Sequence, residues 1–151
     1  MKSYKSKILI FFLSYKASFR ILRSFKEIPF KKLKKFKIKV LVSDDCSNDD
    51  TIKYAYKIKK LYSDLIIKVN KKNLGYGAHI KKCLNYAINK NFDYAIMIHG
   101  DNQYSPIYIP KLLQLANKNI GAVTGSRLKI KARKARSGGM PIYKLLGNII
   151  L

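Results

Sequence analysis

The sequence predicts an α/β fold in which a mostly parallel sheet carries helices on both faces. Apolar runs of strand length alternate along the chain with segments whose apolar residues recur at helical spacing, and this order is typical of parallel sheets. Acidic turns follow two of the strand-like runs, so we expect these turns to meet at one edge of the sheet. The chain has 151 residues and is 48% apolar, which fits a single domain over residues 1–151.

The amino-terminal third predicts two strands with a helix between them. The runs 7–14, KILIFFLS, and 38–42, IKVLV, are apolar and of strand length. Between them, Ser18 is expected to cap a helix that ends at Pro29. A basic connector, residues 31–37, links this helix to the second strand. The residues expected on the buried face of the helix are Phe19, Leu22, Phe25 and Ile28.

An acidic turn follows the second strand. Residues 43–51, SDDCSNDDT, hold half of the chain's 8 Asp+Glu. Asp49 and Asp50 suit the first turn of the helix that follows, where negative charge complements the helix dipole. Asp44 and Asp45 come earlier, at the carboxyl end of the strand, where acidic residues accept hydrogen bonds from a base or a ribose. Simple turn chemistry is the alternative interpretation of these two residues.

The remaining elements continue the alternation of helix and strand. An apolar helix that begins at Pro141 is still running at the last residue, so we expect the domain to be incomplete at its carboxyl end. The other expected elements are a helix over 51–62, a strand over 65–69, a helix that opens near Gly77, a central buried strand over 94–98, a helix over 106–119 and a strand over 121–125.

A polar loop with two glycines, residues 70–78, precedes the third helix. Gly75 and Gly77 would let the backbone approach a ligand closely, and free amides at the start of the helix would face a phosphate group. A simple turn into the helix is the commoner explanation of such a pattern. His79 is expected at the surface. The residues of this helix expected to face the core are Ile80, Leu84, Ala87 and Ile88.

The central strand ends abruptly in a polar turn. This turn reads His99-Gly100-Asp101-Asn102-Gln103. It lies at the carboxyl end of a strand, where open α/β sheets bind ligands. Asp101 and Gln103 offer hard oxygen ligands two residues apart, so the turn predicts a site for a metal and a phosphate. A polar strand-to-helix turn without chemistry is the alternative interpretation.

Charge and cysteine content limit the partners and the setting. The 32 Lys+Arg outnumber the 8 Asp+Glu and give a formal net charge of +24, which attracts nucleic acid, anionic lipids or nucleotide phosphates. The lysines are scattered over every segment and no nucleic-acid recognition motif is present in the sequence. We therefore expect no nucleic acid among the partners. Cys46 and Cys83 lack metal-site spacing, which indicates a reducing, cytoplasmic setting.

Four segments in order resemble conserved stretches of one enzyme family. DDCSNDDT is similar to a D-D-G-S-T-D-D-T turn, and NLGYGAHIKKCLNYAI to an N-x-G-x-G-x-A-x-N-x-G-x-x-x-A loop and helix. HGDNQYSP is similar to a D-x-D-x-Q-x-x-P metal motif, and GSR to a G-S-R that follows the next strand. The tail GGMPIYKLLGN resembles M-P-x-x-R-x-x-G-N. Together they resemble the family 2 glycosyltransferases with a GT-A (Rossmann-like) fold, in the dolichyl-phosphate mannosyltransferase-like branch.

This resemblance implies a metal-assisted, inverting transfer of a sugar from a nucleotide-diphosphate donor. The acceptor would be a polyprenyl phosphate or a cell-surface glycan, reached by peripheral association with the inner face of the membrane. Mg²⁺ or Mn²⁺ would lie on Asp101 and Gln103, with His99 in place of the first aspartate of the motif, and Asp101 would be the catalytic residue. The residues implied in substrate binding are Tyr15, Asp44, Asp45, Asn73, Gly75, Gly77 and Arg127.

The sequence also departs from the family pattern. His99 replaces an aspartate, Cys46 replaces a turn glycine, and residues 13–17, LSYKA, stand where the family has P-A-Y-N-E. Only Tyr15 is retained in that stretch. Family members continue beyond the G-N near the end of this chain, so no catalytic base is assigned. A truncated nucleotide-binding domain without turnover is therefore the second hypothesis, and a basic nucleic-acid-binding protein is the third.

Overall fold

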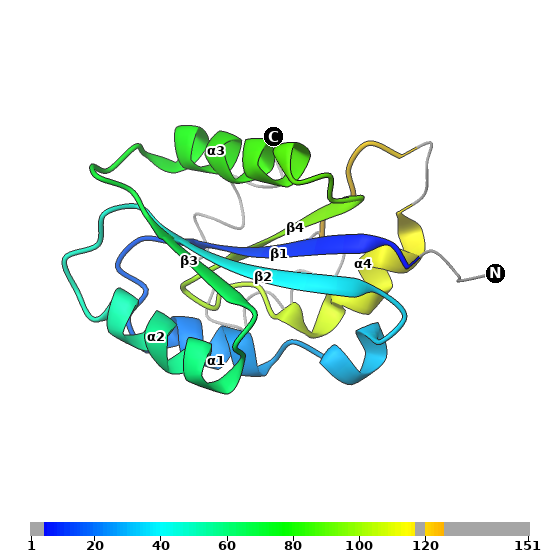
Figure 1. The fold of residues 1–151 in the computed structure, drawn as a ribbon, viewed down its shortest axis with the longest axis horizontal. Helices are drawn as coiled ribbons and strands as arrows, with labels where there is room; N and C mark the ends of the chain where they lie inside the picture. The colour runs from blue at the N-terminus through cyan, green and yellow to red at the C-terminus, as the bar shows by residue number, and fades with distance from the viewer. Residues whose placement is uncertain (1–4, 117–119, 126–151) are drawn as a thin grey trace, which may run out of the picture. The chain divides into compact units, whose positions relative to one another are not determined.

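The computed structural model describes residues 5–116 and 120–125 (Figure 1). In this part of the chain, four parallel strands form one sheet in the order β3-β2-β1-β4. The predicted α/β fold with a parallel sheet is therefore confirmed, and β1 and β3 have the bounds expected from the sequence. The strands are β1 (Lys7–Ser14), β2 (Lys37–Asp44), β3 (Leu65–Val69) and β4 (Tyr94–His99).

Helices cover both faces of this sheet. In Figure 1, α1 and α2 lie next to each other on one face and α3 lies on the other. The chain divides into two compact units, Met1–Lys111 and Leu112–Leu151, and the sheet with α1 to α3 belongs to the first. No helix among the described residues is long and apolar enough to cross a bilayer. The helices are α1 (Arg20–Lys26), η1 (Phe30–Leu33), α2 (Thr51–Leu61), α3 (Tyr76–Asn89), η2 (Pro106–Tyr108) and α4 (Ile109–Leu115), of which η1 and η2 are 3-10 helices.

The core of the first unit is built around β1. This strand lies between β2 and β4 with helices on both faces, so every residue from Ile8 to Phe12 is fully buried. Successive side chains point to opposite faces of the sheet, and each buried Leu, Ile or Phe contributes roughly 1.5–3 kcal/mol. The strand ends are therefore displayed from a rigid frame. The cluster between the sheet and α3 comprises Leu9, Phe11, Leu13, Leu41, Cys83 and Ala87.

The strand β4 lies at the edge of the described sheet. Ala95 and Met97 on one of its faces are exposed, and Ile98 is its one fully buried residue. The expectation of a buried central strand over 94–98 is therefore wrong for the described part of the chain. A run of five apolar residues has the same composition in an edge strand and in a central strand, so the pattern could not distinguish them.

The carboxyl-terminal expectations are met only in part. Residues 120–125 form no strand, so the expected strand over 121–125 is wrong; Gly121 and Gly125 at its two ends weaken strand formation. The expected helix over 106–119 begins as η2 and continues as α4 to Leu115. Residues 117–119, the GSR segment and the helix expected from Pro141 lie outside the described residues.

Two helices bury only some of the residues that their apolar spacing predicted: Phe25, Ile28 and Ala87 are buried as expected. Ser18 does not cap α1: the N-cap residue is Phe19, which makes no side-chain cap hydrogen bond and is 56% exposed. On α3, Leu84 and Ile88 are also exposed. Apolar spacing marks one face of a helix, but it does not tell how far the neighbouring elements extend over that face. The buried residues of α1 are Ile21, Ser24 and Phe25.

The loop after β1 is tied to the start of α2 through its backbone. Thr51 Oγ1 accepts hydrogen bonds from the amides of Ala17 and Ser18, both at 2.9 Å. Ser47 Oγ accepts a third from the amide of Lys16, also at 2.9 Å. Because three consecutive amides are held in this way, the loop that carries Tyr15 has a fixed path at the edge of the sheet.

We expect Thr51→Val to destabilise the protein by about 2–4 kcal/mol, because two amides lose their acceptor and each unpaired buried donor costs roughly 1–3 kcal/mol. Urea unfolding at constant m-value measures this loss. Thr51→Ser is the matched control, since it keeps the hydroxyl and removes only a methyl group. A Thr51→Val variant that is as stable as the wild type, or no less stable than Thr51→Ser, would show that the two hydrogen bonds do not hold the loop.

Candidate functional site

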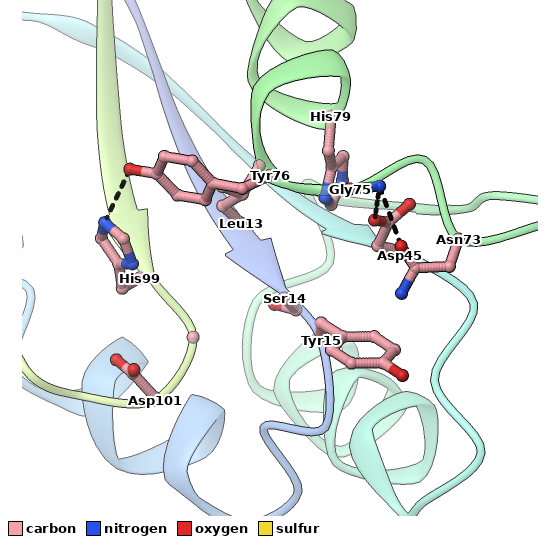
Figure 2. A pocket seen from close by; sticks show the side chains of 11 residues that line it. Leu13, Ser14, Tyr15, Asp45, Asn73, Gly75, Tyr76, His79, His99 and Asp101 are labelled. Atoms are coloured by element: carbon pink, nitrogen blue, oxygen red, sulfur yellow. Dashed lines mark hydrogen bonds between the residues drawn. The ribbon is translucent and has the colours of Figure 1, made fainter.

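A cleft of about 260 Å³ lies at the carboxyl ends of the strands (Figure 2). Asp45, which follows β2, and Asp101, which follows β4, both line it. The register of β1 with both neighbours aligns the three strand ends. The two acidic strand ends therefore meet at one site, as the sequence predicts. Other residues that line the cleft include Ser14, Tyr15, Asn73, Gly75, Tyr76 and His99.

Asp45 is buried and anchors the loop that precedes α3. Its Oδ1 accepts hydrogen bonds from Asn70 Nδ2 at 2.7 Å and from the amide of Leu74 at 2.9 Å. Its Oδ2 accepts one from the amide of Gly75 at 3.0 Å (Figure 2). Burial disfavours the charged carboxylate, but these hydrogen bonds and the nearby His79 outweigh it and hold the pKa of Asp45 below its usual value.

Two amides at the start of α3 are bonded to the protein itself. Asp45 takes the amides of Leu74 and Gly75, and Asn73 Oδ1 accepts from Gly75 as well, at 2.8 Å. These two amides, just before the first turn of α3, are therefore not available to a phosphate, and the expectation of free amides in that turn itself stays a prediction. Gly75 has a φ of +76°, which favours glycine at this turn. A carboxylate offers about four acceptor positions, so Asp45 retains one after these three hydrogen bonds.

Asp44 is fully buried and does not line the cleft. Its Oδ2 accepts from the amide of Ser47 at 2.8 Å and its Oδ1 accepts from Ser47 Oγ at 2.6 Å. These contacts are the turn chemistry that the sequence left open for this residue. Contact between Asp44 and a nucleoside stays a prediction. Asp49 and Asp50 precede the first turn of α2, which holds no acidic residue, so their expected place in that turn is wrong. Asp49 still pairs with an amide at the helix start, because its Oδ1 accepts from the amide of Thr51 at 3.0 Å.

His79 is a buried residue of the cleft wall, so its expected surface position is wrong. It is 2% exposed, and its Nε2 lies 2.8 Å from Ser43 Oγ, at the carboxyl end of β2. Burial lowers the pKa of His79, and the nearby Asp45 and Asp44 oppose that effect only in part. The helical spacing around His79 could not show this, since its partner lies on another element.

The floor of the cleft contains an unpaired hydroxyl. Ser14 Oγ, at the end of β1, is buried and has no hydrogen-bond partner among the described residues. Gly100 passes directly over it: a Cβ added to Gly100 would lie 2.7 Å from Ser14 Oγ. A glycine is therefore required at this position of the turn after β4. Ser14 was not expected in the site, although a serine that ends an otherwise apolar strand was a signal for it.

Asp101 is the side chain best placed to hold a divalent metal. Its Oδ1 accepts a hydrogen bond from the amide of Gln103 at 3.0 Å, and its Oδ2 has no partner within the described ranges. The side chain of Gln103 is exposed and does not line the cleft. Among the described residues, no three His, Cys, Asp or Glu side chains gather as a metal-binding cluster. A carboxylate with an amide two residues on still fits Mg²⁺ or Mn²⁺, which take further ligands from phosphates and water.

His99 forms part of an aromatic wall. Its ring lies 5.6 Å from that of Tyr76 and 5.1 Å from that of Tyr104, between ring centroids. Its Nε2 lies 3.4 Å from the hydroxyl oxygen of Tyr76 (Figure 2). Imidazole is also a weaker ligand than carboxylate for Mg²⁺ or Mn²⁺. The role of His99 as a metal ligand stays a prediction, and its contacts favour a role in shaping the cleft.

Of the remaining predicted site residues, some line the cleft and others do not. Tyr15 lines it with a half-exposed ring, and Asn73 lines it beside the start of α3. Gly77 is an exposed residue of α3 outside the lining. Arg127 lies outside the described residues. Tyr76 is a cleft residue that the sequence did not reveal, because an aromatic residue in the first turn of a helix has no distinctive pattern.

Comparison with known proteins decides the family. The family model of glycosyl transferase family 2 matches residues 15–145. The chain belongs to glycosyltransferase family 2. The match extends over the acidic turn after β2, the glycine loop before α3 and the turn after β4, so it includes every residue that lines the cleft except Leu13 and Ser14 at the end of β1. The predicted family is therefore confirmed, whereas its dolichyl-phosphate mannosyltransferase-like branch stays a prediction.

One protein resembles this family 2 glycosyltransferase chain in sequence, and two solved structures resemble it in fold. Uncharacterized protein MJ0544 of Methanocaldococcus jannaschii is 38% identical over 100 residues, which cover 64% of this chain and 44% of that protein. The mannosyltransferase PcManGT of Pyrobaculum calidifontis, solved in complex with GDP-Man and Mn²⁺, gives a TM-score of 0.67 at 17% identity and covers 89% of this chain and 39% of that one. S. aureus TarS 1-349 in complex with UDP gives 0.51 at 19% identity, with 74% and 31% covered. This chain thus spans less than half the length of these relatives.

We expect Cys46→Gly to stabilise the protein by about 0.5–1 kcal/mol. Cys46 stands where the family has a turn glycine and adopts a φ of +64°, a conformation that costs a residue with a Cβ roughly 1–2 kcal/mol. The larger conformational freedom of glycine in the unfolded chain offsets roughly 0.4–1 kcal/mol of this gain. Thermal and urea unfolding measure the change. Cys46→Ala removes the thiol but keeps the Cβ, and an equal gain in this control would contradict the explanation by backbone strain.

We also expect the stability to fall with pH below about 6.5, the ordinary pKa of histidine. The folded state binds the proton of His79 less readily than the unfolded state, so the stability is complete above this pH and decreases as the pH falls toward the lowered pKa of the folded protein. Asp45 adds a second loss at lower pH, below its ordinary value of 3.8. His79→Gln keeps a polar partner for Ser43 and should flatten the profile between about pH 7 and pH 5. If the free energy of unfolding in urea depended on pH in the same way in the wild type and in His79→Gln, this assignment would be refuted.

Proposed function

We propose that this chain is the donor-binding domain of a glycosyltransferase that moves a sugar from a nucleotide diphosphate to its acceptor with inversion. The observation that carries the proposal is the meeting of Asp45 and Asp101 in one cleft of a family 2 domain. The two carboxylates differ in their surroundings. Asp45 is bonded on both oxygens, whereas Asp101 keeps one oxygen without a partner among the described residues, so we assign them different roles.

The nucleoside would bind between Tyr15 and the start of α3. The half-exposed ring of Tyr15 offers a stacking surface for a base, an interaction worth roughly 1–3 kcal/mol. The remaining acceptor position of Asp45 suits an N–H of the base or a hydroxyl of the ribose. Ser14 Oγ and the amide of Asn73 add polar groups to the same part of the cleft. The relatives solved with GDP-Man and with UDP support a nucleotide donor.

The diphosphate would lie toward Asp101. Asp101 and, through its exposed amide, Gln103 would hold Mn²⁺ or Mg²⁺; the Mn²⁺ in the mannosyltransferase structure supports such a metal. A bound divalent cation would neutralise the charge that develops on the leaving diphosphate as the anomeric carbon is attacked. The ring of His99, packed on Tyr76, would close the cleft beside this group and limit the entry of water.

The proposal for the sugar acceptor rests on the charge of the chain and not on a pocket. A formal net charge of +24 suits an anionic lipid phosphate or a glycan at the cytoplasmic face of the membrane, in keeping with the resemblance to the dolichyl-phosphate mannosyltransferase-like branch. A second candidate function is nucleotide binding without turnover, because the groups assigned above bind the donor and the metal and none of them is assigned as a catalytic base. Transfer to a membrane extract distinguishes the two.

We expect Mn²⁺ to increase the affinity for GDP-mannose or UDP-sugars by about tenfold or more, and Asp101→Asn to abolish the increase, since substitutions at a metal centre typically cost 10–100-fold in affinity. Calorimetric titration with and without Mn²⁺ measures both effects. Asp64→Asn, which removes a carboxylate paired with Lys39 at 2.7 Å on the surface, is the control for the loss of charge. Metal-independent binding that Asp101→Asn leaves unchanged would defeat the assignment.

A further inference from the structure

A network of polar side chains joins α1 to the turn after β4. Asn102 Oδ1 accepts a hydrogen bond from Ser24 Oγ at 2.6 Å, and Asn102 Nδ2 lies 3.4 Å from Glu27 Oε1. The second oxygen of Glu27 accepts from Ser105 Oγ at 2.6 Å. The side-chain amide of Asn102 thus bridges Ser24 and Glu27 at the end of α1. The carboxylate of Glu27 in turn contacts both ends of the loop 102–105.

From this network we infer that Ser24 and Glu27 are positioning residues for the metal site. They act through Asn102, which stands between the two expected metal ligands, Asp101 and Gln103. The inference deepens the proposed function and rests on it. It assigns a role in metal binding to the end of a helix, α1, none of whose residues lines the cleft.

The backbone of the turn shows why it needs support. Asn102 has a φ of +62°, a left-handed conformation that asparagine adopts more readily than most residues but that still costs free energy. This conformation lets the chain double back, so that the amide of Gln103 reaches Asp101 Oδ1 at 3.0 Å. The direction of the Asp101 carboxylate therefore depends on the conformation of Asn102. That conformation is held by α1.

The character of the two α1 residues agrees with a positioning role. Ser24 is fully buried, and a buried hydroxyl needs a hydrogen-bond partner, which Asn102 supplies. Glu27 is the one glutamate of the chain, and its contacts with the turn are charge-assisted, about twice as strong as neutral hydrogen bonds. Its other contact, with Arg23 at 3.7 Å, is exposed, and such pairs contribute little. The carboxylate thus serves the turn.

The other wall of the cleft has separate supports, and this gives a selective test. Tyr15 is held by the loop anchored to Thr51, and Asp45 is held by Asn70 and the start of α3. Loss of the α1 contacts should therefore weaken metal binding and leave metal-free nucleotide binding intact. A role of Glu27 in overall stability alone would lower both affinities together or neither of them.

The experiment measures Mn²⁺ binding by electron paramagnetic resonance of free Mn²⁺, in the presence of saturating GDP or UDP. We expect Glu27→Gln and Ser24→Ala to weaken Mn²⁺ binding by about tenfold, the size typical of residues that orient metal ligands. Asn102→Gly keeps the left-handed backbone but removes both side-chain contacts, and it should weaken binding to the same extent. Arg23→Ala and Asp64→Asn are controls expected to bind like the wild type.

Nucleotide affinity without metal is measured on the same proteins and should stay within about twofold of the wild type if the nucleoside wall is independent. Wild-type Mn²⁺ affinity in all three variants would overturn the inference and leave the proposed function intact. Equal losses of metal-free nucleotide binding would also overturn it, because they would show a general loss of structure. A wild-type protein that binds no Mn²⁺ in the presence of nucleotide would overturn the metal assignment itself, and the inference with it.

Discussion

The buried carboxylate of Asp45 is the contact on which the candidate site depends. It joins the end of β2 to the loop at Asn70 and the start of α3, which follow 25 to 30 residues later in the sequence. Lys82 donates to Asn70 Oδ1 and so orients the amide with its nitrogen toward Asp45. To leave such buried donors unpaired costs roughly 1–3 kcal/mol each. Folding therefore fixes this wall of the cleft before a ligand binds. The negative charge that complements the start of α3 is the carboxylate of Asp45 itself.

Backbone anchoring explains how the loop after β1 can differ from the family pattern and still carry Tyr15 to the cleft. Thr51 and Ser47 hold this loop through the amides of residues 16–18. Any residue except proline supplies an amide, so the absence of the family's asparagine and acid does not remove the anchor. What changes is the floor beneath: where the family has alanine, Ser14 brings a hydroxyl that has no partner among the described residues.

The parts of the fold that the sequence predicted are those fixed by local pattern and by the geometry of parallel sheets. Lys7–Ser14 and Leu65–Val69 were found from apolar runs alone, and Asp45 and Asp101 were expected together because parallel strand ends share one edge. The errors concern partners distant in sequence. His79 is buried because Ser43 lies beside it, and β4 lies at the edge because of the order of the strands. Neither fact can be inferred from a short window of neighbouring residues in the sequence.

The distribution of the few acidic residues gives a physical reason why the proposed function would need a metal. A chain with a formal charge of +24 attracts a nucleotide diphosphate over much of its surface, yet the cleft presents it with the carboxylate of Asp101. Alone, that carboxylate would repel the diphosphate; with a divalent cation between them, the same charge becomes a bridge. Under the proposed function, Asp101 thus makes productive binding depend on the metal and selects the cleft from the rest of a basic surface. Asp45 also lines the cleft, but its carboxylate already accepts three hydrogen bonds from the protein. The acidic residues outside the cleft have partners of their own: Glu27, Asp44, Asp49 and Asp93 accept hydrogen bonds, and Asp50 and Asp64 pair with lysines.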